Sequence, residues 1–247
     1  TISYQGRGIP ILIKSWKGVH TSYDYWSRVE ETLRDLKEII PSKFKYEILA
    51  DRGFQGDVLF SLCDKLDMPY IIRVNDCYKV KTPGGKTYMQ LSLFKDGFYP
   101  IEHFGRFKQT TGINLIVNTD ENHPDTPKWY LATNRQSSQQ EIVEKYKQRF
   151  WIEETFKDLK SKLNWEKYTK KLPEKDRLIK CIAVSSLSYC IQTAIGKELK
   201  MSNSEKKTTS LFNKFRQAFR RGNRELENII MKFISYLSTY IKRYKFL

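Results

Sequence analysis

Apolar and polar positions follow two different periods along the chain, and together these periods predict a mixed α/β fold. Apolar residues alternate at 9–13 and form short runs at 46–50 and 70–74, a pattern typical of strands. Helical spacing of three and four residues occurs at 24–40 and again at 56–67. The order strand, helix, strand, helix, strand predicts a partly parallel sheet with helices beside it.

The first sixteen residues predict a β-hairpin. Thr1–Tyr4 and Ile9–Trp16 form its strands, and Gln5–Gly8 forms the turn. The chain starts in structured-looking sequence rather than at a methionine, so we expect an N-terminally truncated piece of a longer protein.

The pattern changes after the third predicted core strand. Short alternating runs and the turn Pro83–Gly85 predict a mainly β insertion. Helical spacing then dominates, with helices expected over about 138–163, over 174–198 and in the tail from 209. We therefore expect a first part of the core, a β insertion, a remainder of the core and a basic helical C-terminal segment, over residues 1–76, 77–134, 135–200 and 201–247.

The charge balance indicates a polyanionic partner. The chain has 44 lysines and arginines against 28 acidic residues, a net charge of +16. Residues 201–247 hold 11 basic and 3 acidic residues, half of that excess. Basic side chains gain affinity by releasing counterions from phosphates, so we expect nucleic acid as the partner. The alternative is a protein that is basic without a polyanionic partner.

The cysteine and hydropathy patterns favour a reduced, cytoplasmic protein. Cys63, Cys77, Cys181 and Cys190 form no C-x-x-C pair, and the histidines are scattered, so a zinc site is not expected. The sequence has no run of about 18 apolar residues that would predict a membrane span.

Asp51 is the first candidate for chemistry. It follows the apolar run 46–50 directly, at the carboxyl end of a predicted strand. In open α/β sheets this end of the strands is where binding sites form, so a carboxylate there suits a divalent cation. The alternative is an aspartate that only forms a turn.

A second group of candidates lies on the predicted helix 138–163. At about 100° per residue, four side chains fall within about 60° of one helix face. They are Tyr146, Arg149, Glu153 and Lys160. A glutamate there can bind metal, while the other three groups hold phosphates. The alternative is an exposed amphipathic helix with ordinary charge pairs such as Glu153–Lys157.

An apolar stripe beside these residues predicts the helix face that packs on the core. Its members are Ile152, Phe156, Leu159 and Leu163.

The spacing Tyr-x2-Arg-x3-Glu-x6-Lys of the four polar residues resembles the YREK signature of DDE transposases of the insertion-sequence-four type. Asp51-Arg52-Gly53-Phe54 is similar to the segment that carries the second catalytic aspartate of that family. Other segments, in the same order, resemble the preceding strand pair, the strand that closes the family's β insertion and the start of its C-terminal helices. These segments are Tyr4–Leu12, Trp129–Asn134 and Ser210–Phe212.

The resemblance implies an RNase H-like core with a β insertion, in a DNA transposase that cleaves transposon ends and joins them to target DNA. It implies two divalent ions, Mg²⁺ or Mn²⁺, with Asp51 binding one and Glu153 the other. It also implies that Tyr146, Arg149 and Lys160 contact phosphates of double-stranded DNA. A homodimer is implied too, because paired ends are held together.

The chain departs from the family in one respect. The family uses three carboxylates, the first on a strand upstream of the second. Residues 1–23 contain no Asp or Glu, and Asp24 falls at the start of a predicted helix. We therefore expect the chain alone to bind Mg²⁺ weakly and to be inactive. Two alternatives are a non-catalytic DNA-binding remnant of a transposase and a general RNase H-like nuclease without end recognition.

The C-terminal segment holds further candidates for contact with the DNA backbone. Its basic residues alternate with aromatic ones, which favours phosphate contact by a helix, with Arg216 and Arg220 foremost. The alternative is an amphipathic helix whose aromatic residues are in the core. The cluster consists of Lys214, Arg216, Arg220, Arg221 and Arg224, with Phe212 just before them and Phe215 and Phe219 between them.

Overall fold

The chain divides into two units. One consists of residues 1–13 and 150–247, and the other of residues 14–149. The structure is a computed structural model. It describes residues 1–4, 6–12, 14, 22–105, 112–119, 128–162, 175–199, 211–222 and 224–244.

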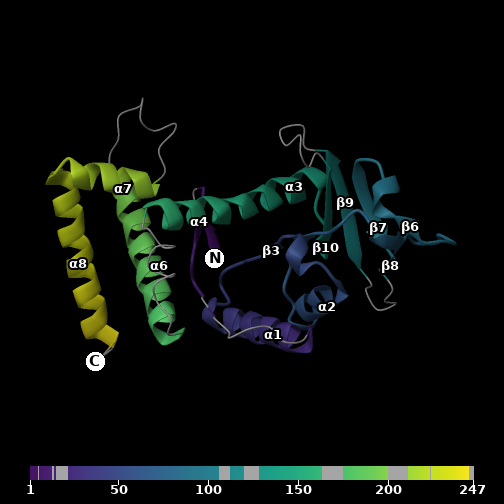
Figure 1. Ribbon diagram of the computed structural model, residues 1–247, viewed down its shortest axis with the longest axis horizontal. Coiled ribbons are helices and arrows are strands. Elements are labelled where there is room, and N and C mark those ends of the chain that lie inside the picture. The colour runs from purple at the N-terminus through teal and green to yellow at the C-terminus, as the bar shows by residue number, and fades with distance from the viewer. Residues whose placement is uncertain are drawn as a thin grey trace. The chain divides into compact units, whose positions relative to one another are not determined.

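A five-stranded sheet is the centre of the unit formed by residues 14–149 (Figure 1). The strands β3 and β4 are parallel, and each remaining pair of neighbours is antiparallel. The predicted mixed α/β class and the parallel pairing of the runs 46–50 and 70–74 are thus confirmed. The first strand of the predicted order is not in this sheet, because it pairs within the hairpin in a separate two-stranded sheet. In spatial order the strands are β3 (Ile48–Ala50), β4 (Tyr70–Arg73), β10 (Lys128–Thr133), β9 (Ile113–Thr119) and β7 (Gly97–Ile101).

Helices cover both faces of this sheet, which explains why β4 and β10 are apolar almost throughout. On one face, side chains of α1 (Ser22–Ile39) and α2 (Asp57–Lys65) share a core with Tyr70, Ile72 and Ala132. The helix α3 (Gln139–Lys147) packs on β9, and its Tyr146 contacts Trp129 of β10. The predicted helices 24–40 and 56–67 are confirmed.

The predicted β insertion contributes to both sheets of this unit. A small sheet in the order β6-β5-β8 adds Val80 and Phe104 to the same core. By contrast, β7, β9 and β10 belong to the main sheet. Residues 106–111 and 120–127 lie outside the described residues. The small sheet comprises β5 (Lys79–Lys81), β6 (Met89–Gln90) and β8 (His103–Phe104), with the 3-10 turn η2 (Leu91–Leu93) beside it.

The helix predicted over 138–163 is confirmed over residues 139–162, except that a 3-10 turn, η3 (Gln148–Phe150), interrupts it between α3 and α4 (Trp151–Lys162). Ser138 caps α3 by accepting a hydrogen bond from the Glu141 N–H, as its S-x-x-E pattern favours. At the C-terminal end of α3, the Gln148 N–H donates to the carbonyl oxygens of Lys145 and Tyr146. The tighter turn breaks the 3.6-residue period, so the YREK residues do not share one uninterrupted helix face.

The other unit combines a short hairpin with helices (Figure 1). The hairpin pairs Ile2 with Ile9 and is shorter than predicted, because Pro10 has no N–H to continue the ladder. The predicted strand end at Trp16 lies outside the described residues. The predicted helices over 174–198 and in the tail are confirmed. The elements are β1 (Ile2–Tyr4), β2 (Arg7–Ile9), α4, α6 (Lys175–Glu198), α7 (Leu211–Arg220) and α8 (Arg224–Tyr244).

Candidate active site

Asp51 caps the turn that follows strand β3. Its Oδ1 accepts a hydrogen bond from the Gly53 N–H at 2.9 Å and begins the 3-10 turn η1 (Arg52–Phe54). The turn-forming alternative is therefore correct as a structural role. The Asp51 carboxylate is nevertheless exposed at the carboxyl end of a parallel strand, where it is accessible to a ligand.

Arg73 lies beside Asp51 and was not among the predicted site residues. The parallel strands β3 and β4 place Ala50 opposite Ile72, so the next residues, Asp51 and Arg73, lie at the same edge. Ala50 and Ile72 belong to the core shared with α1 and α2. Side chains alternate along a strand, so Asp51 and Arg73 are on the opposite face, on the side of α3. A basic residue at the end of an apolar run is the only signal in the sequence.

An aromatic pair on this face supports two guanidinium groups. The buried rings of Trp129 and Tyr146 meet edge to face, with their centroids 5.5 Å apart. The Cζ of Arg73 lies 5.9 Å from the Trp129 ring centroid, and the Cζ of Arg149 lies 5.7 Å from that of Tyr146. The end of α3 and the turn η3 thus bring Tyr146 and Arg149 to the sheet face of Asp51.

Tyr146 is buried, although the resemblance implies that it contacts DNA phosphates. Its exposed fraction is 0%. Burial raises the pKa of the Tyr146 phenol to about 12, although the positive charges of Arg149 and Arg73 lower it. The phenol is therefore neutral near pH 7, and its ring faces Trp129 rather than the surface.

Glu153 and Lys160 are exposed on helix α4, in the unit that holds the hairpin. The predicted apolar stripe beside them is only partly correct. Leu159 is buried, but Phe156 is 42% exposed, and Leu163 lies outside the described residues. The buried face of α4 instead includes two polar residues, Thr155 and Asp158.

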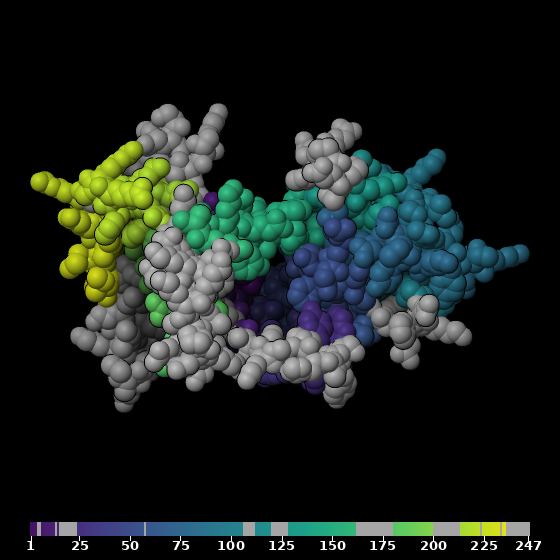
Figure 2. Space-filling view, in the orientation of Figure 1, coloured from purple at the N-terminus to yellow at the C-terminus, as the bar shows by residue number. Residues whose placement is uncertain are grey.

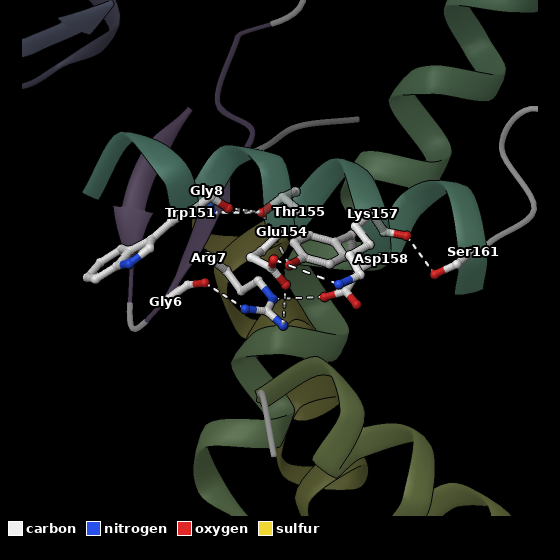
Figure 3. Close-up of polar contacts among 10 residues, drawn as sticks. Gly6, Arg7, Gly8, Trp151, Glu154, Thr155, Lys157, Asp158 and Ser161 are labelled. Atoms are coloured by element: carbon white, nitrogen blue, oxygen red, sulfur yellow. Dashed lines mark hydrogen bonds and ion pairs between the residues drawn. The ribbon is translucent and has the colours of Figure 1, made fainter. Parts of the chain in front are cut away.

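The hairpin contributes hydrogen-bond and ion-pair partners to these polar residues, which compensates for their burial (Figure 3). Arg7 Nε donates to Asp158 Oδ2 at 2.8 Å, and Arg7 Nη2 lies 3.8 Å from Glu154 Oε2. The Gly8 N–H donates to Thr155 Oγ1 at 2.8 Å, and that oxygen lies 3.4 Å from the Tyr189 hydroxyl of α6. No local pattern predicts the role of Arg7, because its partners are far away along the chain.

The close approach of backbone to backbone explains the glycine at position 8. A Cβ on Gly8 would lie 3.1 Å from Ile152 Cα and 3.2 Å from Thr1 Oγ1. The hairpin therefore packs directly on the turn of α4 that carries Glu153, which fixes the position of this part of the helix.

Helix α7 has basic and aromatic side chains at the surface, in the part of the molecule coloured yellow-green to yellow in Figure 2. Arg220 is exposed, Arg216 is partly buried and Phe219 is 67% exposed. The rings of Phe215 and Phe219 stack at 6.0 Å, while Ala218 contributes to a small core with α6 and α8. The exposure of Phe219 therefore contradicts, for this residue, the alternative in which the aromatic residues are in the core. The side chain of Phe212 lies outside those described.

The donor chemistry of Asp51 and Glu153 suits a hard divalent cation. Both are exposed carboxylates, and Mg²⁺ prefers oxygen ligands. In the described parts of the chain, no three His, Cys, Asp or Glu residues gather into a metal site. Asp51 belongs to the unit of residues 14–149, and Glu153 belongs to the other unit.

Within the same described parts, no helix is long and apolar enough to cross a membrane.

Residues 27–179, more than half of the chain, match the transposase DDE domain. No curated protein and no solved structure matches the chain. The matched region includes both the end of β3, with Asp51, and the helix with Glu153. From this match over the two candidate carboxylates and the sheet strands between them in sequence, we conclude that the chain belongs to the transposase DDE domain family.

Proposed function

We propose that this chain is the core of a transposase of the insertion-sequence-four type, with an RNase H-like fold, that cleaves DNA at transposon ends and transfers the strands. The observation that carries the proposal is the exposed carboxylate of Asp51 at the end of a parallel strand, beside Arg73. Cations next to a reactive carboxylate suit a polyanionic substrate, because they hold its phosphates and stabilise charge that develops during cleavage.

Asp51 and Glu153 would hold divalent ions, Mg²⁺ or Mn²⁺. Such ions, when bound, supply activation of the attacking oxygen and stabilisation of the leaving oxygen in phosphoryl transfer. Arg149 and Lys160 hold DNA phosphates in position. Tyr146 acts through Arg149, because its ring is buried beneath that guanidinium.

Double-stranded DNA is the partner, with Arg216 and Arg220 adding contacts to its backbone. We further propose a homodimer, since transposition joins two ends in one complex.

One alternative is a non-catalytic DNA-binding protein. It is favoured by the absence of Asp and Glu from residues 1–23. It retains the basic surface and predicts DNA binding without cleavage.

Nicking of supercoiled plasmid separates these functions. The wild-type chain, Asp51→Asn and Glu153→Gln are compared in Mg²⁺, in Mn²⁺ and in EDTA, with DNA affinity measured in parallel. The chain alone should bind DNA without nicking it, because residues 1–23 hold no Asp or Glu. Once a segment with the first catalytic aspartate of the family is supplied upstream, we expect metal-dependent nicking that either substitution lowers at least about 100-fold without loss of DNA affinity.

Glu144→Gln is the matched control. Glu144 is an exposed carboxylate that pairs with Lys147 on the surface of α3, so its removal leaves nicking unchanged. Equal nicking by the wild type and Asp51→Asn would overturn the assigned roles. Tight DNA binding with no nicking in either metal, even with that upstream segment supplied, would leave the non-catalytic function.

A further inference from the structure

We infer that two copies of this chain pair antiparallel through one face of helix α6 (Figure 1). The pairing surface is a row of apolar side chains, the α6 stripe, made of Val184, Leu187, Ile191 and Ala194. The inference rests on the proposed function for the purpose of the dimer, which is to hold two DNA ends together. The surface itself is defined by the residues of α6.

The packing of its own unit buries two sides of α6. Ser186, Tyr189 and Thr193 are buried on one side, where Tyr189 packs with Leu159 of α4. On another side, Ile195 is buried in the small core shared with α7 and α8. At about 100° per residue, the α6 stripe occupies the remaining side, within an arc of about 80°.

The α6 stripe is apolar and yet largely exposed. Val184 is 67% exposed and Leu187 is 63% exposed. Ala194 is exposed as well, and Ile191 is partly buried at the edge of the core with α7 and α8. A helix face in contact with water normally carries polar residues, and a helix that is apolar on every side is typical of one that is covered on every side. The stripe therefore has the character of a surface that a partner covers.

The spacing of the α6 stripe suits a second helix. Its members follow one another at intervals of three, four and three residues, as the a and d positions of a heptad do. When two such helices run antiparallel about a twofold axis, Leu187 faces Ile191 of the partner subunit, and Val184 faces Ala194 of the partner subunit. Each large side chain thus meets an apolar side chain of the other copy, and the same residues serve both copies.

The charges at the two ends of the stripe favour a second copy of this chain in this direction. Lys180 and Glu198 are both exposed and lie on the line of the stripe, about five turns apart. The register that places Leu187 opposite Ile191 also places Lys180 opposite Glu198 of the partner subunit, at both ends of the pair. A parallel pair would instead bring like charges together.

The position of Glu198 strengthens this argument. It is the last residue of α6, where the helix dipole disfavours a negative charge. A lysine from a second copy would relieve this unfavourable interaction. Antiparallel pairing therefore satisfies the apolar stripe and the charge at the helix end together.

Sedimentation velocity of the full chain, without DNA or metal, tests the surface. Stable interfaces bury about 800 Å² on each partner, more than four side chains provide, so we expect a reversible dimer with a Kd on the order of micromolar. Leu187→Glu places a charge in the middle of the seam and should raise the Kd at least about 10-fold. Far-UV circular dichroism verifies that the variant is folded.

Leu93→Glu is the matched control, because Leu93 is 68% exposed in the turn η2 of the other unit. Its Kd should stay within about twofold of wild type, since a charge on an unused surface has little effect. A protein that is monomeric at all concentrations, as expected if a different partner covers the stripe, would overturn the inference. Equal Kd values for the wild type and folded Leu187→Glu would do the same.

Charge reversal tests the antiparallel direction. Lys180→Glu and Glu198→Lys should each raise the Kd by about threefold to 10-fold, because each places like charges at both ends of the seam. The double variant Lys180→Glu/Glu198→Lys restores opposite charges and should return the Kd to within about twofold of wild type. A double variant that dimerises no better than the single ones would refute the pairing. Plasmid nicking does not enter these measurements, so failure of the proposed function would be seen separately.

Discussion

Arg7 and Asp158 form an ion pair between the first hairpin and helix α4, although 151 positions separate them in the sequence. The distance from Nε to Oδ2 is 2.8 Å, and the side chains are only 14% and 7% exposed. The pair joins the hairpin to the helix that carries Glu153. The placement of one candidate catalytic carboxylate thus depends on the opening residues of the chain.

Removing one partner of this pair should destabilise the protein strongly. Asp158→Ala leaves the Arg7 charge without its closest partner in a poorly hydrated place, so we expect a loss of about 3–5 kcal/mol in the free energy of unfolding. The double variant Arg7→Met/Asp158→Leu should recover most of this loss. Urea unfolding measures both, with Glu144→Gln as the exposed comparison. A loss in the single variant no larger than in the comparison would show that the pair contributes little.

Gly8→Ala should weaken the contact between the hairpin and α4. The added Cβ would meet Ile152 Cα at 3.1 Å, and backbone atoms cannot move aside as a flexible side chain can. We expect a cost of about 1–3 kcal/mol, the usual range for overpacking. Thermal unfolding of Gly8→Ala and of Ser3→Ala, on the paired strand, gives the comparison. An unchanged melting temperature in Gly8→Ala would mean that the hairpin adjusts without cost.

Alkaline pH should destabilise the fold through Tyr146. The pKa of this phenol is raised to about 12 in the folded protein, above its ordinary value of 10.0. Between these values the unfolded state loses its proton while the folded state keeps it. The stabilisation is thus complete below pH 10 and is lost as the pH rises to about 12, by up to about 1.4 kcal/mol per pH unit.

Urea midpoints of the wild type and Tyr146→Phe between pH 9 and pH 11.5 test this contribution. Other groups, including Tyr189 with a pKa also raised to about 12, titrate in both proteins. The difference between the two curves therefore reports Tyr146. Parallel curves would show that burial of this phenol has no linkage to stability.

Replacing Arg216 and Arg220 by Gln should weaken DNA binding and its salt dependence together. Removal of one phosphate contact lowers the slope of log K against log salt by about 0.9, so the double variant should have a slope smaller by nearly two units. Fluorescence anisotropy at several salt concentrations measures the slope. Lys65→Gln, which removes a cation paired with Glu30 on the other unit, is the control. Equal slopes for all three proteins would remove α7 from the DNA-binding surface.

Local sequence patterns were sufficient for strands β4 and β10 of the main sheet. The runs that became β4 and β10 are apolar because both of their faces are covered, and such runs stand out without knowledge of their partners. The same holds for α1, whose apolar spacing and following Pro41 mark a helix and its end.

The features that the sequence did not reveal depend on distant partners. Thr155 and Asp158 have polar side chains, so a prediction based on hydropathy places them on the surface. In the structure they are buried because Gly8 and Arg7, which are distant in the sequence, are their hydrogen-bond partners. The break between α3 and α4 contains neither proline nor glycine. Arg73 gains meaning only through the strand register, which no local pattern encodes.

The position of β10 limits how this protein can be reshaped. The strand comes from the end of the predicted insertion, yet it pairs with β4 on one side and β9 on the other. Excising residues 77–134 as a self-contained module would leave the backbone of β4 unpaired along one side. A strand edge with unpaired N–H and C=O groups pairs with strands of other chains, which leads to aggregation. Engineering or natural shortening of this region therefore has to keep β10 as part of the scaffold that carries Arg73 and Trp129.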